Sequence, residues 1–528
     1  MIPLALVLAV VAASGRPHLA DLRVGNGAGP FAGDRRLVTT VSPNGDGFRD
    51  AAIVRFRLGE PAVVRLDVLR TDTIREGRAA VAVVWSARRS LSAGPGWIVW
   101  RPARSTPPRT YIVRLTVTDR LGRTRTYGAY GPSGRQDAPV VRVQGIDAAF
   151  TKRSYAPGDL ADLTIATDAR SVKVQVFAYG NQAHPTPRDL RTSGAAMTPP
   201  VTLDWTRHRS APARIRVVRA GNWASGLYFV RVTAADGRVG YAPLVVRPRR
   251  LGAHRVAVVL ATNTWQAYNF AHANGDGWGD TWYVSGEERR VDLQRPYLDF
   301  GVPFRFHDWD LTFVSWLDTT GKRVDFLTDD DLERIGSAAE LARAYDLIVF
   351  PGHEEYVTKH VYDLVSGYRD LGGNLAFLAA NNFFRQVTRS GRWLVRGRLW
   401  RDLGRPEASL VGVQYVGSNH GEKQEPYVVR GASSAPWLFA GTGLTDGDQF
   451  GRYGIEIDAR TPASPPGTQL LADIPNLLGA GRTAEMTYYE TPRGAKVFAA
   501  GVMNFGGSAL WPGVSEMVAN IWTQLSRP

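Results

Sequence analysis

The chain has 528 residues, enough for about three or four domains of ordinary size. Its composition, 44% hydrophobic and 21% charged, is typical of a globular protein and argues against a disordered or membrane-spanning one. There is no cysteine, which excludes disulfides, thiolate metal sites and a cysteine nucleophile. The net charge of +15 would suit a nucleic-acid partner, but the basic residues are scattered and form no patch or stripe, so we expect no nucleic-acid partner.

Residues 2–13 form a short apolar run that ends in small residues. Such a run has the length of a signal-peptide core and is too short to span a bilayer, although a buried strand is the alternative. We therefore predict a signal peptide over residues 1–15 and a Gly/Pro-rich linker over residues 16–36. Because no later segment is long and apolar enough for a transmembrane anchor, we expect a secreted or cell-surface, extracytoplasmic protein.

Two all-β sandwiches are predicted next, over residues 37–141 and 142–248. Apolar and polar residues alternate in runs such as 52–58 and 62–68, as in strands with one buried face, and no helical period interrupts them. Strands at this spacing favour a sandwich. The S-P-N-G-D-G-x-x-D run that begins at Ser42 resembles the opening of FlgD-type and related immunoglobulin-like modules of secreted bacterial proteins.

The pattern changes after the second sandwich, where continuous apolar strands alternate with helical patterns. Such strands are typical of a parallel sheet that is covered on both faces. The predicted strands are 256–261, 324–327, 347–350 and 375–379. We therefore predict a doubly wound α/β domain over residues 249–528. The segment from Asp346 to Tyr356 resembles class I glutamine amidotransferase-like folds, but the missing cysteine excludes their thiol mechanism.

Polar side chains follow the carboxyl ends of three predicted strands. In an open α/β sheet the ligand site lies beyond these ends, so we expect the side chains to line one functional crevice. The residues predicted to bind substrate are Asn263, Trp265 and Asn269. The residues predicted to take part in catalysis from these loops are His353, Glu354 and Asn381.

The region from Arg255 to the end carries several longer motifs. They are N-T-W-Q-A-Y-N at 263–269, N-G-D-G-W-G-D-T-W-Y at 274–283, G-H-E-E-Y at 352–356, G-G-N-L-A-F at 372–377 and M-T-Y-Y-E-T-P at 486–492. With these motifs the region resembles the C-terminal domain of the large (beta) subunit of N,N-dimethylformamidase. The resemblance implies metal-dependent hydrolysis of a linear amide, and a small partner subunit or a homo-oligomer.

The same resemblance implies a mononuclear iron held by two tyrosinates and one glutamate. Tyr356 matches one phenolate, and Glu422 is the predicted carboxylate. The motifs leave the second tyrosinate open, with Tyr268 as one candidate. A hard, Lewis-acidic ferric ion suits such oxygen ligands and could polarise an amide carbonyl. The predicted proton carriers are His420, Glu354 and Glu490.

The pattern N-G-D-G-x-x-D occurs twice. Its oxygen-bearing residues are Asn44, Asp46 and Asp50 in the first copy and Asn274, Asp276 and Asp280 in the second. Alternating side-chain oxygens with intervening glycines resemble the start of a calcium loop. A plain Asx/Gly turn is the alternative, because these residues favour such turns without a metal and neither copy has the distal glutamate of an EF-hand.

Two functions are consistent with these patterns. The first is an exported hydrolase that cleaves an amide-type C–N bond of a small-molecule or envelope-derived substrate in the crevice of the C-terminal region. The second is a non-catalytic secreted or surface protein that recognises an envelope glycan or protein. Titratable residues at three strand ends favour the hydrolase, because a pure binding domain has less need of them.

Overall fold

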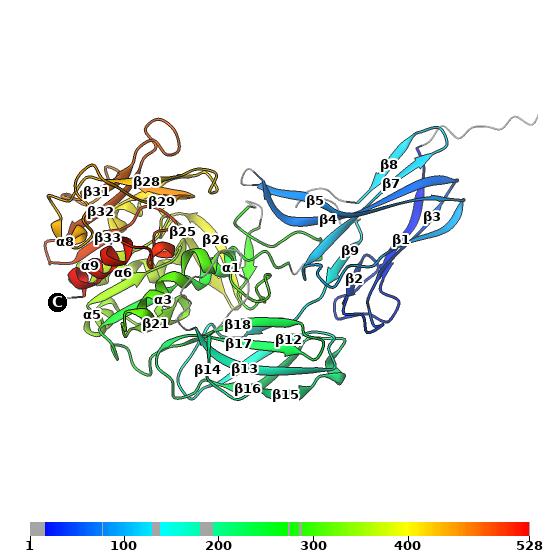
Figure 1. Cartoon of the computed structure of the whole chain (residues 1–528), viewed down its shortest axis with the longest axis horizontal. Helices are drawn as coiled ribbons and strands as arrows, with labels where there is room; N and C mark the ends of the chain where they lie inside the picture. The colour runs from blue at the N-terminus through cyan, green and yellow to red at the C-terminus, as the bar shows by residue number, and fades with distance from the viewer. Residues whose placement is uncertain are drawn as a thin grey trace, which may run out of the picture. The chain divides into compact units, whose positions relative to one another are not determined.

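The computed structural model describes residues 16–75, 78–128, 138–179, 194–272, 275–284 and 288–526 (Figure 1). The predicted signal peptide, residues 1–15, lies outside the described residues, as does Asn274 of the second calcium-like loop. The chain divides into two compact units. The first consists of Met1–Thr73, Ala80–Gln144 and Asn274–Trp278, and the second of Ile74–Ala79, Gly145–Ala273 and Gly279–Pro528.

The first unit is a β-sandwich around one apolar core, here called the first sandwich. One sheet has the order β1-β3-β6, with β1 (Leu19–Gly25), β3 (Ala52–Leu58) and β6 (Gly94–Trp100). The other has the order β2-β9-β7-β4-β5 with β8 beside β7, and comprises β2 (Val38–Val41), β4 (Ala62–Arg75), β5 (Arg78–Leu91), β7 (Thr110–Asp119), β8 (Thr124–Tyr127) and β9 (Val140–Val143). Every second residue of β3 is buried, which is the period of a strand with one face on a core.

Strand β1 lies inside the segment predicted as a linker. Its residues Leu19 and Val24 are buried in the core of the first sandwich, and the strand pairs antiparallel with β3. The sequence pattern did not predict this strand, because residues 16–36 are rich in glycine and proline and contain few apolar side chains. The segment therefore belongs to the sandwich and is not a linker.

A second sandwich begins the second unit. One sheet has the order β10-β12-β16, with β10 (Asp147–Phe150), β12 (Leu160–Ala166) and β16 (Ala213–Arg219). The other has the order β11-β18-β17-β13-β14 with β15 beside β13, and comprises β11 (Ser154–Tyr155), β13 (Ser171–Tyr179), β14 (Gly194–Ala196), β15 (Val201–Asp204), β17 (Gly226–Ala234) and β18 (Val239–Val246). The short helix η1 (Thr206–His208) follows Trp205, which is buried in the core between the sheets.

The rest of the second unit, here called the C-terminal region, is built on a mixed sheet with the order β21-β19-β22-β24-β33-β32-β31-β28-β29. Its parallel part comprises β19 (Val256–Leu260), β21 (Asp325–Thr328), β22 (Leu347–Phe350), β24 (Asn374–Phe377) and β33 (Lys496–Ala499). Its antiparallel part comprises β28 (Gln424–Val429), β29 (Gln449–Gly454), β31 (Gln469–Ile474) and β32 (Ala484–Glu490).

Smaller sheets and short helices complete this region. One sheet has the order β20-β26-β25-β23, with β20 (Arg290–Asp292), β23 (Tyr356–Thr358), β25 (Arg385–Ser390) and β26 (Trp393–Leu399); β27 (Gln414–Ser418) pairs with β30 (Glu456–Ala459). The helices are α1 (Thr262–Ala267), α2 (Phe306–Trp309), α3 (Leu311–Thr319), α4 (Asp329–Leu332), α5 (Ala338–Ala344), α6 (Lys359–Asp370), η2 (Arg401–Leu403), α7 (Ala408–Val411), α8 (Pro436–Phe439), η3 (Gly506–Ser508) and α9 (Val514–Leu525).

The prediction of a doubly wound α/β domain, and with it the likeness to glutamine amidotransferase-like folds, is wrong. The described chain is mostly β, with 42% strand and 15% helix. The apolar strands between residues 256 and 379 led to the prediction, because they form the parallel part of the sheet. The strand-rich segment after residue 380 then adds antiparallel strands to the same sheet and builds separate smaller sheets, which breaks the strand–helix alternation.

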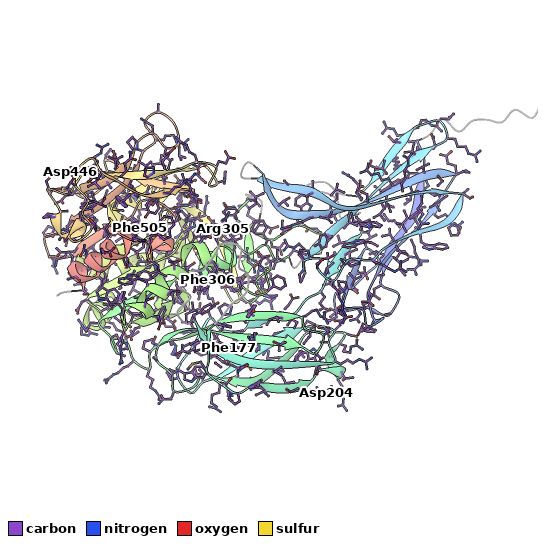
Figure 2. The ribbon with its side chains drawn as sticks, in the orientation of Figure 1. Phe177, Asp204, Arg305, Phe306, Asp446 and Phe505 are labelled. Atoms are coloured by element: carbon purple, nitrogen blue, oxygen red, sulfur yellow. The ribbon has the colours of Figure 1, made fainter. Side chains whose placement is uncertain are left out.

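The second sandwich and the C-terminal region share an apolar core. The Tyr179 ring lies 5.3 Å from the Phe306 ring and 4.8 Å from the Phe229 ring, and Phe177 stacks on Phe229 at 5.3 Å. Phe177 and Phe306 are labelled in Figure 2. Because these aromatic side chains bury large areas, they hold the two parts together as one packed body.

Arg153 connects the same two parts through polar contacts. It follows β10, and its guanidinium donates to Asp330 (Nε to Oδ2, 3.0 Å) and to Asn263 (Nη1 to Oδ1, 2.7 Å). Arg389 of β25 also pairs with Asp330. The Arg153 side chain is 9% exposed, so its ion pair is largely removed from water.

We expect Arg153→Met to lower the free energy of unfolding by ~2–4 kcal/mol, because the mostly buried carboxylate of Asp330 then keeps only Arg389 as a cationic partner. Urea unfolding followed by circular dichroism measures the change. Lys152→Met, at the exposed neighbouring position, is the control and should change stability by under ~0.5 kcal/mol. Equal stability of the two variants would show that the Arg153 contacts contribute nothing to the joint between the two parts.

Candidate functional site

Four segments of the C-terminal region meet at the carboxyl ends of its parallel strands. They are α1 after β19, residues 351–356 after β22, residues 380–384 after β24, and β30. Strand β30 lies beside the end of β33, since the Asp458 N–H donates to the Gly501 carbonyl at 3.0 Å and Ile457 pairs with Val502. Such ends are where ligands bind in open sheets with parallel strands.

Glu355 is the centre of a buried cluster with two tyrosines. The Tyr268 hydroxyl donates to Glu355 Oε2, and the side chain of Tyr356 is hydrogen-bonded to the same carboxyl group. The Glu355 N–H donates to Thr264 Oγ1 at 3.2 Å, which fixes the turn against α1. We call Tyr268, Glu355 and Tyr356 the tyrosine–glutamate cluster.

His353 and Glu456 lie beside this cluster. The Nε2 atom of His353 is 3.7 Å from Glu355 Oε2 and 3.6 Å from Glu456 Oε2, so the imidazole sits between two carboxyl groups. Neither ring nitrogen has a well-formed hydrogen bond to the described residues, and the backbone of Asn381 is its further polar neighbour. The imidazole is therefore within reach of two carboxyl groups without a hydrogen bond to either.

Burial controls the protonation of these groups. It lowers the pKa of His353 to about 3 and raises the pKa of Glu355 to about 7. Burial, followed by the charge of Glu355, raises the pKa of Glu456 well above its usual value. Burial and the Glu355 charge also raise the pKa values of Tyr268 and Tyr356 well above their usual range. A cation placed among these groups would favour their ionised forms.

Asn381 positions Glu456. Its Nδ2 donates to Glu456 Oε2 at 2.7 Å, and its backbone N–H donates to both carboxylate oxygens of Asp458 at 2.9 Å. Its φ of 55° is left-handed, a conformation that asparagine tolerates better than most residues. The Oδ1 atom of Asn381 is buried and has no hydrogen-bond partner among the described residues.

Aromatic rings surround the cluster. The ring of Tyr268 lies 4.9 Å from that of Tyr283, and the ring of Tyr356 lies 4.8 Å from that of Trp282. Trp309 packs edge-on against His353 at 5.8 Å. These rings keep the polar groups away from bulk water, which strengthens electrostatic interactions among them.

Glu354 belongs to a separate acidic pair, which it forms with Asp329. Its carboxyl group is hydrogen-bonded to that of Asp329, and burial followed by the Asp329 charge raises the pKa of Glu354 well above its usual value. Asp329 also accepts hydrogen bonds from Thr262 Oγ1 (2.8 Å) and from the Asn263 backbone N–H (2.7 Å) and Nδ2 (2.8 Å). Glu354 thus forms a buried acidic pair with Asp329 and is not part of the tyrosine–glutamate cluster.

The residues predicted to bind substrate are engaged within the protein. Asn263 donates to Asp329 and to the Tyr356 carbonyl, and it accepts from Arg153. Asn269 donates to the Pro296 carbonyl and accepts from two backbone N–H groups. The Trp265 indole N–H donates to Asp310 at 3.3 Å. Their polar atoms therefore support the architecture of the site.

Three predicted residues lie elsewhere. His420 and Glu422 are exposed on the turn between β27 and β28, whereas the groups of the cluster are buried. Glu490 is exposed at the end of β32 and pairs in register with Lys496, the first residue of β33. Because β32 runs antiparallel to β33, its end lies at the edge of the sheet opposite the carboxyl ends.

The structure adds Glu355, Glu456 and Asp458 to the predicted residues. Glu355 stands between predicted residues in the G-H-E-E-Y turn, and its position next to Tyr356 was the available signal. Glu456 and Asp458 alternate with Ile455 and Ile457, a pattern that normally indicates a solvent-exposed strand face. The pairing of β30 with the end of β33 buries that face, and no local pattern shows this pairing.

The first calcium-like loop forms an Asx/Gly turn in the structure. Asp50 accepts from the N–H groups of Gly45 (2.9 Å) and Gly47 (2.8 Å), and Asn44 Oδ1 accepts from the Asp46 N–H at 3.0 Å. In the second copy, Asp276 accepts from the Trp278 N–H at 2.8 Å, and Asp280 is buried with an oxygen 4.0 Å from Arg295. The hydrogen bonds favour the turn, and calcium stays a prediction.

In the described part of the chain, no three His, Cys, Asp or Glu side chains gather closely enough to hold a metal ion. A metal at the cluster would therefore need the phenol oxygens of Tyr268 and Tyr356 as ligands beside Glu355. Phenolate and carboxylate oxygens are hard ligands, and such a set suits a ferric ion.

The comparison with known families matches this region. Residues 179–513 match the family described as N,N-dimethylformamidase beta subunit-like, C-terminal, over more than half of the chain. The chain belongs to this family. The matched range contains the tyrosine–glutamate cluster, His353 and Glu456, and it begins at the last residue of β13.

Two curated proteins resemble the same region. The N,N-dimethylformamidase beta subunit of Alcaligenes sp is 25% identical over 281 residues, and that of Paracoccus aminophilus is 23% identical over 282 residues. Each alignment covers 41% of this chain and 36% of the relative, so the chain matches about a third of the length of these relatives. A solved structure, dimeric latent PorU from Porphyromonas gingivalis, covers 44% of this chain and 20% of its own at 13% identity and a TM-score of 0.16, too low to support any argument.

We expect Asp310→Asn to raise the melting temperature at pH 8 and to raise it by less at pH 5. Burial raises the pKa of Asp310 from 3.8 to about 7, so the folded state holds a proton that the unfolded state releases between these values. Stability therefore falls as the pH rises through this range, by up to ~1.4 kcal/mol per pH unit, and the amide removes that loss.

Differential scanning calorimetry at both pH values measures the effect. Asp318→Asn, exposed on α3, is the matched control and should show the wild-type pH dependence. A melting temperature of Asp310→Asn below wild type at pH 8 would contradict the assignment of a protonated Asp310.

Proposed function

We propose that this protein hydrolyses a linear amide at the tyrosine–glutamate cluster. One observation carries the proposal: two buried phenols share the carboxylate of Glu355, next to the imidazole of His353. Membership of the family and the names of the two curated relatives support an amide hydrolase. Because the chain matches only about a third of the length of those relatives, the reaction and the substrate proposed here rest on the chemistry of the cluster.

We further propose that the cluster holds iron. Tyr268, Glu355 and Tyr356 would supply two phenolates and one carboxylate, with Glu355 in the place predicted for Glu422. Burial raises the pKa of each of the three, so a trivalent cation is the kind of partner that would keep them ionised. When bound, a ferric ion supplies Lewis acidity that polarises the amide carbonyl.

The protein's own groups would move the proton. A neutral His353 accepts a proton from the attacking water as the water oxygen bonds to the carbonyl carbon. The carboxyl group of Glu456, held by Asn381, passes a proton to the amide nitrogen as the C–N bond breaks. The products are a carboxylic acid and an amine. The aromatic rings around Tyr268 and Tyr356 limit the water that reaches the site.

We expect Tyr268→Phe and Tyr356→Phe to lose bound iron and at least ~100-fold in kcat/KM, because each removes a ligand oxygen. The measurements are metal analysis, the phenolate-to-iron absorption band, and hydrolysis of linear formamides with N,N-dimethylformamide as the first probe. Tyr362→Phe, which removes another buried hydroxyl outside the site, is the control and should keep iron and activity.

An active protein without a transition metal would overturn the iron proposal and leave the amide hydrolase. A protein with neither metal nor amidase activity would favour the non-catalytic binding protein, with the two sandwiches recognising an envelope glycan or protein.

We also propose export, which rests on the apolar run at residues 2–13 and the absence of cysteine. Among the described residues there is no helix long and apolar enough to cross a bilayer. The full chain, expressed in a bacterium with a periplasm, should be recovered outside the cytoplasm, and the chain starting at residue 16 should stay inside. Cytoplasmic recovery of both would contradict export.

A further inference from the structure

Three arginines line a cavity beside the tyrosine–glutamate cluster. The cavity has a volume of about 280 Å³, and its walls are Arg289, Arg385, Arg396 and Gly397. We call it the arginine pocket. Its volume is close to the lower limit of small-molecule sites, which leaves room for one acidic group and a few further atoms.

The sheet places this pocket next to the cluster. Strand β25 pairs parallel with β23, with Arg385 in register with Tyr356, and the Arg385 N–H donates to the Glu355 carbonyl at 3.0 Å. The guanidinium of Arg396 lies 5.7 Å from the centre of the Trp282 ring, and that ring packs on Tyr356. A molecule with its acidic group in the pocket would therefore have its next few atoms near the cluster.

A break in the strand register shapes the pocket. Between Arg385 and Val387 the pairing of β25 with β26 shifts, so that Gly397 faces the backbone of Gln386. A Cβ atom at Gly397 would lie 2.6 Å from the Gln386 carbonyl oxygen, which excludes other residues without a shift. The Gly397 carbonyl accepts from Arg385 Nη1 at 2.9 Å and holds that side chain at the pocket wall. Bulges of this kind commonly re-aim side chains beside functional sites.

Two of the three arginines in the pocket, Arg289 and Arg385, lack a matching carboxylate within the described part of the chain. Neither Arg289 nor Arg385 has an acidic side chain within 4.0 Å among the described residues, whereas Arg389 and Arg392 of the same sheet pair with Asp330 and Asp292. The guanidinium groups of Arg289, Arg385 and Arg396 line the same pocket, so like charges gather there. An anion is the ligand that would relieve this repulsion.

We propose that the arginine pocket binds the carboxylate of an anionic amide substrate, whose amide group then reaches the tyrosine–glutamate cluster. Planar guanidinium groups match a carboxylate in geometry and charge. The inference rests on the proposed amide hydrolase and narrows its substrates to N-acyl or N-formyl amino acids and similar acids.

Calorimetric titration tests binding without catalysis. The probes are N-formylglycine, its neutral amide N-formylglycinamide, and inorganic phosphate. We expect N-formylglycine to bind the wild-type protein at least ~10-fold more tightly than the neutral amide, and Arg385→Gln and Arg289→Gln to remove most of this preference by weakening N-formylglycine binding ~10-fold. Arg398→Gln, exposed on the same strand as Gly397 and outside the pocket, is the control and should keep the preference.

Kinetics test the coupling to the reaction. The ratio of kcat/KM for N-formylglycine to that for N-formylglycinamide should exceed one in the wild type and fall in Arg385→Gln and Arg289→Gln, whatever the absolute rates. Equal affinity for the acid and the amide, or binding of phosphate without binding of N-formylglycine, would overturn the carboxylate assignment. Selective binding of N-formylglycine without any hydrolysis would keep the pocket and overturn the proposed amide hydrolase.

Discussion

The side chain of Asn263 connects the segments on which the candidate site depends. Its amide donates to Asp329, which follows β21, and to the carbonyl of Tyr356, which follows β22. Its oxygen accepts from Arg153 of the second sandwich and lies 3.4 Å from a guanidinium nitrogen of Arg389 in β25. One buried amide therefore holds together two strand ends, a small sheet and a neighbouring domain. Asn263 therefore fixes the positions of Glu355 and Tyr356. Its own amide donors and its acceptor are all engaged within the protein, so it does not contact a ligand.

Around this anchor, acidic groups are buried in neighbouring pairs. Asp329 and Glu354 form one pair, whose pKa values burial raises, and Glu355 and Glu456 form the other, on either side of His353. Burial of so many carboxyl groups costs folding free energy unless protons, hydrogen bonds or cations compensate them. The positive charge of Arg153 partly compensates the pair of Asp329 and Glu354, whereas Arg389 pairs with the neighbouring Asp330. Glu355 and Glu456 instead have two phenols and an imidazole near them, which is an arrangement suited to binding a metal ion.

The sequence allowed a good part of the site to be predicted, and the limits are physical. Apolar runs located the parallel strands within one or two residues, and the rule about carboxyl ends brought Tyr268, His353, Tyr356 and Asn381 to one place. Glu456 was not predicted, because β30 reaches the site through a pairing with a distant segment of the chain. The predictions for His420 and Glu422 relied on residue type within a resemblance, and a turn between two strands carries both to the surface.

The predicted fold class failed for a related reason. The apolar period of a strand shows that it is buried but says little about the direction of its neighbours in the sheet. The segment between residues 380 and 495 contains strands whose antiparallel partners come from distant parts of the sequence. Strand direction, and with it the mixed sheet, was set by these distant contacts.

The joint between the second sandwich and the C-terminal region has a consequence for where the folding unit begins. The family match starts at residue 179, at the end of β13, whereas the shared aromatic core includes Phe177 and the anchor at Asn263 needs Arg153. A fragment cut at the family boundary would keep the tyrosine–glutamate cluster but lose most of β13 and the strands before it. In this chain the family match therefore covers less than the packed unit, because the C-terminal region also contacts the strands of the second sandwich that precede residue 179.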